Sequence, residues 1–95
     1  MIPVPYNALS QPLDTATTDK EYQLPGNSLE FATDGSFTGI TVRVGSKKAD
    51  AIPLDRFKAL KFPVGFKEFY VTWTAQSGKT LYIFVGRENC QVRRV

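Results

Sequence analysis

Apolar and polar residues alternate over short stretches from residue 20 onward, which is the pattern of half-buried β-strands. In the clearest stretch, Ile40, Val42 and Val44 share one face while Thr41 and Arg43 share the other. Turn signals rich in Gly, Pro, Asn and Asp separate the stretches. The predicted strands span residues 20–24, 28–33, 40–44, 51–54, 55–62, 68–74 and 80–85, with 91–95 as a further candidate.

The predictions for two neighbouring segments depend on Pro63. Residues 55–62 fit a strand or a helical turn, and we predict a strand because the stretch is short and ends at Pro63. Residues 63–66 are predicted to be a loop.

This number and spacing of strands predicts an all-β chain, a small antiparallel β-sandwich or barrel with a jelly-roll-like arrangement. The alternation also predicts the residues of its core. They are Phe31, Ile40, Val42, Val44, Leu54, Val71, Leu81, Ile83 and Val85.

The last two long strands are expected to pair as a hairpin around a turn in which Gly78 has a positive φ angle. Both faces of that hairpin would be apolar, with Tyr70, Tyr82 and Phe84 on the face that the core does not need. An exposed face of this kind is an aggregation hazard. We therefore expect a homo-oligomer, with a trimer favoured, and these three aromatics at the subunit contact.

Residues 1–19 have no sustained period and are punctuated by Pro3, Pro5 and Pro12. They predict an extended N-terminal arm in front of a β-domain that spans residues 20–95. The arm contains more apolar side chains than a free tail needs, so we expect it to pack against its own domain or a partner. The expected anchors are Ile2, Val4, Tyr6, Leu9 and Leu13.

Composition narrows the class of protein. With 95 residues the chain is long enough for one small domain, and 42% hydrophobic and 13% aromatic residues exclude a disordered chain. The longest apolar run found, residues 81–85, is far shorter than the ~20 residues of a membrane-spanning helix. Residues 1–5 include neither a basic patch nor an apolar run, so no signal peptide is expected.

The chain has no histidine and a single cysteine, Cys90. Ser-His-Asp and Cys-His nucleophile systems and Cys/His zinc sites are therefore excluded. Residues 77–80 (Ser-Gly-Lys-Thr) match the end of a phosphate-binding loop, but Trp73 stands where that motif needs its first glycine. We expect no catalytic residues, no cofactor and no metal.

Charge is distributed unevenly. Residues 1–34 contain five acidic and one basic residue, whereas residues 35–95 contain four acidic and eleven basic residues. The two parts could attract each other between copies, or both could be ordinary solvated surface. Basic residues near Phe57, Phe62 and Phe66 would suit a nucleic-acid-binding barrel, but a net charge of +3 is weak for a polyanion binder, so nucleic acid is not the expected partner.

Four stretches carry a resemblance to a known group of proteins. They are residues 6–14 (Tyr-Asn-Ala-Leu-Ser-Gln-Pro-Leu-Asp), 23–27 (Gln-Leu-Pro-Gly-Asn), 52–54 (Ile-Pro-Leu) and 69–86 (Phe-Tyr-Val-Thr-Trp-Thr-Ala-Gln-Ser-Gly-Lys-Thr-Leu-Tyr-Ile-Phe-Val-Gly). In these stretches the chain resembles small virion structural proteins of tailed bacteriophages, although Trp73 stands where those proteins have asparagine.

The resemblance implies a non-enzymatic component of the virion, assembled in the host cytoplasm. The favoured role is a capsid decoration (cement) protein bound to the major capsid protein. A tail, neck or baseplate component is the alternative. Independently of the resemblance, exposed aromatics would also suit a small sugar-binding module for host attachment.

Overall fold

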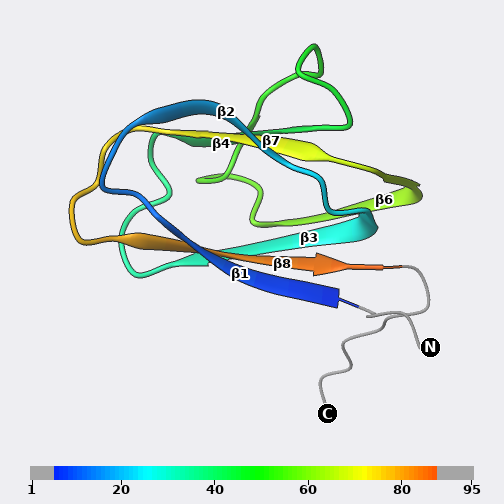
Figure 1. Cartoon of the computed structure of the whole chain (residues 1–95), viewed down its shortest axis with the longest axis horizontal. Coiled ribbons are helices and arrows are strands. Elements are labelled where there is room, and N and C mark those ends of the chain that lie inside the picture. Colours follow the sequence, from blue (N-terminus) through cyan, green and yellow to red (C-terminus); the bar gives the residue numbers. More distant parts are fainter. Residues whose placement is uncertain (1–5, 88–95) are drawn as a thin grey trace.

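Eight β-strands form two four-stranded antiparallel sheets in the computed structural model, which describes residues 6–87 (Figure 1). The all-β prediction is confirmed. The strands are β1 (Tyr6–Pro12), β2 (Thr17–Tyr22), β3 (Gly26–Thr33), β4 (Ile40–Val44), β5 (Ile52–Pro53), β6 (Ala59–Phe66), β7 (Phe69–Trp73) and β8 (Thr80–Gly86).

The strand order is that of a jelly roll. The first sheet has the order β1-β8-β3-β6 and the second has the order β2-β7-β4-β5. Strands β1 to β4 therefore pair with β8, β7, β6 and β5 in turn, alternating between the two sheets. This is the pattern obtained when one long antiparallel ribbon is rolled into a sandwich.

The expected hairpin of β7 and β8 does not form. These strands lie in opposite sheets, and the connection through residues 74–79 carries the chain from one sheet to the other (Figure 1). Gly78 has the positive φ expected for it, 74°, and its N–H donates to Asp14 Oδ1 at 2.8 Å. The turn was located correctly. Apolar residues alternate on both β7 and β8 because each strand has its inner face in the core between the sheets.

Strand β6 corrects the predictions for residues 55–66. It runs from Ala59 to Phe66, through the proline that was expected to end it. Between the pairs Gly26–Phe66 and Ser28–Lys61 the register with β3 shifts, so residues 62–65 form a bulge on an edge strand. An edge strand tolerates proline because the missing N–H is not needed on its open side.

The core lies between the two sheets. All nine residues predicted for it are buried except Val44, which is partly buried and packs against the others. The structure adds residues that the prediction omitted. They are Leu13, Leu29, Phe66, Phe69 and Trp73.

Residues 6–19 are not an arm separate from the domain. Tyr6–Pro12 pair with β8 over the whole length of β1, and Leu13 is completely buried in the core. The predicted boundary at residue 20 falls inside β2. The prolines misled the prediction because Pro12 only ends an edge strand, which costs no ladder hydrogen bond. Ile2, Val4 and Cys90 lie outside the described residues, as does the strand proposed for 91–95.

Tyr22 connects the two sheets on the side of the molecule where their edge strands β1 and β2 lie. Its ring stacks on Phe69 with centroids 5.2 Å apart, and its hydroxyl donates to Gln11 Oε1 at 2.5 Å. Burial raises the pKa of Tyr22 from 10.0 to about 12. The ionised phenolate is therefore disfavoured in the folded state relative to the unfolded chain.

This shift predicts a loss of stability in alkali. As pH rises from about 10 to 12, the unfolded chain releases the Tyr22 proton while the folded chain retains it, so the free energy of unfolding falls. Because the side chain is only half-buried, we expect a loss of about 1–2 kcal/mol. Urea denaturation at several pH values measures it, and Tyr22→Phe should remove this part of the decline. If the free energy of unfolding fell equally with pH in the wild-type chain and in Tyr22→Phe, the prediction would be wrong.

Candidate functional site

The aromatic residues predicted at a subunit contact lie on opposite sides of the molecule. Tyr6, Tyr82 and Phe84 are on the outer side of the first sheet, whereas Tyr70 is on the outer side of the second sheet. The contact of Tyr70, Tyr82 and Phe84 was predicted from a hairpin that does not form, and side chains on the outer sides of two different sheets cannot belong to one flat surface. That the protein forms a homo-oligomer, with a trimer favoured, stays a prediction.

Tyr6, Tyr82 and Phe84, here called the outer aromatic face, lie together on the outer side of the first sheet. Tyr6 is 46% exposed and Tyr82 is 44% exposed, and the ring of Tyr6 stacks on Phe84 with centroids 5.2 Å apart. Around Tyr82 the neighbours are small: Ser10 pairs with it on one side and Ala32 on the other. The result is a shallow hollow of about 240 Å³ beside the Tyr82 ring.

Two expected anchors face the core instead of a partner. Leu9 is partly buried and packs against the core cluster, and Leu13 is a member of it. The backbone N–H of Leu13 donates to Lys79 O at 2.9 Å, and its carbonyl accepts from the N–H of Gln76 at 2.6 Å. Leu13 therefore fixes the connection between the two sheets.

Tyr70 is covered by its own chain. It is only 7% exposed, and the ammonium of Lys47 lies 5.8 Å from its ring centroid. Burial and the carboxylates of Glu68, Glu21 and Asp19 raise the pKa of Tyr70. The residue is thus part of the packing between the second sheet and the loop that follows β4.

A polar cluster beside Tyr70 was not found from the sequence. Asp19 has a φ of 49°, at a register shift in β2, and its N–H donates to Thr72 Oγ1 at 2.8 Å. Thr72 Oγ1 in turn donates to Asp19 Oδ1 at 3.3 Å, and Arg43 Nε lies 3.5 Å from the same oxygen. These contacts hold the bulge of β2 against β7 and β4. They mark a structural cluster whose members come from three strands, which no local pattern reveals.

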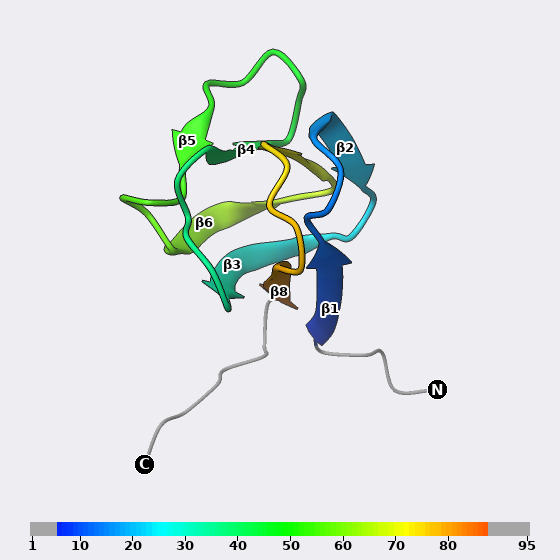
Figure 2. The same cartoon turned by 90° about the vertical axis from the view of Figure 1, so that its left-hand side faces the viewer.

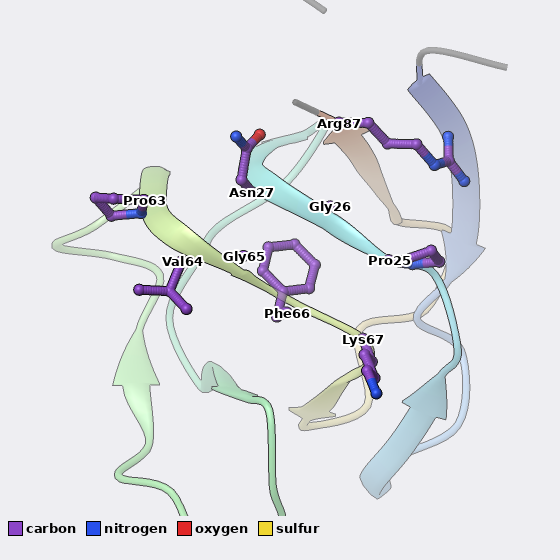
Figure 3. Close-up of a pocket in the computed structure, with 9 residues that line it drawn as sticks. All are labelled: Pro25, Gly26, Asn27, Pro63, Val64, Gly65, Phe66, Lys67 and Arg87. Atoms are coloured by element: carbon purple, nitrogen blue, oxygen red, sulfur yellow. The ribbon is translucent and has the colours of Figure 1, made fainter. Parts of the chain in front are cut away.

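A second hollow, of about 490 Å³, lies at the corner where the β6 bulge meets the start of β3 (Figure 3). Val64, on the bulge, is 99% exposed, and Phe66 forms part of the floor. Arg87, which directly follows β8, extends toward β1 and donates to Asn7 Oδ1 at 2.6 Å. The remaining lining residues are Pro25, Gly26, Asn27, Pro63, Gly65 and Lys67.

Neither hollow brings together groups for general acid–base or nucleophilic chemistry. The outer aromatic face has one carboxylate beside it, Glu30, and the β6 corner has two cationic side chains, Lys67 and Arg87. Among residues 6–87, no group of three or more His, Cys, Asp or Glu side chains is placed to hold a metal ion. The described part of the chain also contains no helix long and apolar enough to cross a membrane. What both hollows offer is apolar contact area.

No protein-family model, no curated protein and no solved structure matches the chain.

Proposed function

We propose that the protein is a non-enzymatic structural component of a tailed-bacteriophage virion, and that it decorates and stabilises the capsid. The jelly-roll strand order is the observation that carries the proposal, because eight-stranded jelly rolls are common in viral capsid proteins. Lectins and cupins share the fold, so the fold alone does not decide the function. The resemblance of residues 6–14, 23–27, 52–54 and 69–86 to small virion proteins favours the capsid among these classes.

The surface is consistent with a protein that works by contact. Its exposed large hydrophobic residues include Tyr6 and Tyr82 on the first sheet and Val64 on the β6 bulge. Large exposed apolar side chains gathered on one sheet are typical of surfaces that contact other macromolecules. A decoration protein needs such surfaces and needs no catalytic groups.

Copy number distinguishes capsid from tail. Quantitative mass spectrometry of purified particles of the encoding virus should find the protein at hundreds of copies if it decorates the capsid. A few to tens of copies would instead assign it to the tail, neck or baseplate. Absence from the particles would contradict a virion role.

The role of the N-terminus needs a shorter deletion than the arm prediction suggested. Removing residues 2–13 would remove β1 and Leu13, whereas removing residues 2–5 leaves both in place. If Ile2 and Val4 anchor the protein to the particle, the 2–5 deletion should keep the thermal unfolding of the full chain and load particles at least about tenfold less well, since burying one such side chain is worth about 1.5–3 kcal/mol. Full loading would show that attachment uses other surfaces.

A further inference from the structure

Within residues 6–87, strand β1 is an open edge of the first sheet. Figure 2 shows β8 between β3 and β1, with no further strand beyond β1. Leu13 N–H donates to Lys79 O, so the residues that alternate with it, Gln11, Leu9 and Asn7, direct their backbone groups toward β8. The N–H and C=O groups of Tyr6, Ala8 and Ser10 therefore point away from the sheet.

The other three edge strands have features that oppose pairing with a further strand. β6 has a bulge, Pro63 and the charged Lys61. β2 has a register shift at the positive-φ Asp19, and β5 has only two residues, one of them proline. Bulges, prolines, charges and short length are the usual ways in which proteins protect sheet edges.

β1 has none of this protection over its first six residues. Its sequence, Tyr-Asn-Ala-Leu-Ser-Gln-Pro, contains no charged residue, and its register with β8 is unbroken from Tyr6 to Pro12. Its single proline stands at the end of the strand. An unprotected, regular edge of this length is a site at which another strand adds.

We propose that β1 is a self-association edge, at which β1 of a second copy pairs with it antiparallel about a two-fold axis near Ala8. A two-fold axis makes the strand face its own sequence in reverse, with the residue at the axis opposite its counterpart, so an uncharged strand can pair with itself without repulsion between like charges. The other edges of a second copy are blocked, which leaves β1 as the partner for β1. Pairing two like edges also closes the assembly at two copies.

Side-chain sizes on the outer aromatic face fit this pairing. With Ala8 opposite Ala8 of the second copy, Tyr6 lies opposite the small Ser10 of that copy, whose own neighbour on β8 is Tyr82. Tyr6 and Tyr82 of the second copy are then two strand spacings apart, roughly 10 Å between Cα atoms, within reach of two aromatic side chains. The hollow beside Tyr82, over Ala8 and Ser10, is the space that Tyr6 of the other copy would enter. The two most exposed aromatics of this face would thus cover each other.

Light scattering coupled to size exclusion tests the proposal with matched variants. The wild-type chain should elute with twice its 10.6 kDa mass. Ala8→Lys places two ammonium groups opposite each other at the axis and should raise the dissociation constant about a hundredfold or more. Ala59→Lys is the control, because Ala59 is exposed in the same row of the outer side but lies on β6, the opposite edge of the sheet, away from the hollow. It should stay dimeric.

Each other result overturns the proposal. A wild-type chain that is monomeric at submillimolar concentration, or an Ala8→Lys variant that is still dimeric, would show that two copies do not pair through β1. Dissociation by both variants would assign the contact to the sheet face instead of its edge. Should Ala8→Lys fail to fold, amide exchange of the wild-type chain decides: protection of the Ala8 and Ser10 N–H groups must increase with protein concentration. The proposal does not depend on where the protein works, so it can fail while the virion role holds.

Discussion

Leu13→Asp is expected to unfold the protein. Leu13 has no exposed surface and packs with the residues of both sheets that form the core cluster. Placing a carboxylate there without a partner costs several kcal/mol, either as a buried charge or as a protonated acid. A domain of this size has a total stability of about 5–14 kcal/mol, so the variant should lose most of it.

Ala16→Asp is the matched control. Ala16 is exposed in the connection between β1 and β2, three residues further along the chain. The same new charge should change the free energy of unfolding by less than about 0.5 kcal/mol. Urea denaturation followed by circular dichroism compares the two. If Leu13→Asp unfolds as cooperatively and at the same urea concentration as the control, then residues 6–13 are a detachable arm after all.

The sequence predicted the strands where local alternation is sufficient. Ile40–Val44 illustrates this, because apolar residues on one side and polar ones on the other fix which face is buried. The same local rule failed for β7 and β8. Their alternation is correct, yet it cannot distinguish two strands that pair with each other from two that face each other across a core. That choice depends on β1, β3, β2 and β4, which are distant in the sequence.

The candidate site was predicted only in part for the same reason. The outer positions of Tyr82 and Phe84 follow from the parity of β8, and that parity is visible in the sequence. That Ser10 and Ala32 flank Tyr82 depends on pairing with β1 and β3, over separations of about 50 residues or more. β1 itself was taken for an arm because an edge strand that is half-exposed, uncharged and ended by proline resembles a linker in composition.

Trp73 shows how the structure changes the meaning of the resemblance. The small phage virion proteins that the chain resembles have asparagine at this position. A polar residue there, in a strand close to a turn, would suit a contact with a partner. In this protein Trp73 is 3% exposed and lies between the sheets, where it pairs with Ile40 of β4 and Thr17 of β2. Its Nε1–H donates to Thr15 O at 2.8 Å and so ties the β1–β2 connection to the core. The position is therefore structural in this chain.

Trp73→Asn should accordingly destabilise the fold about as much as Trp73→Ala, by roughly 3–5 kcal/mol, because either change empties a buried volume that neighbouring strands cannot fill. Trp73→Phe keeps most of that volume and loses the hydrogen bond to Thr15, so it should cost about 1–2 kcal/mol. Since Trp73 is the only tryptophan, thermal and urea unfolding of the variants are best followed by circular dichroism. If Trp73→Asn were as stable as the wild-type chain, the side chain would not be part of the core. Position 73 could then contact a partner, as proposed for the asparagine of the small phage virion proteins.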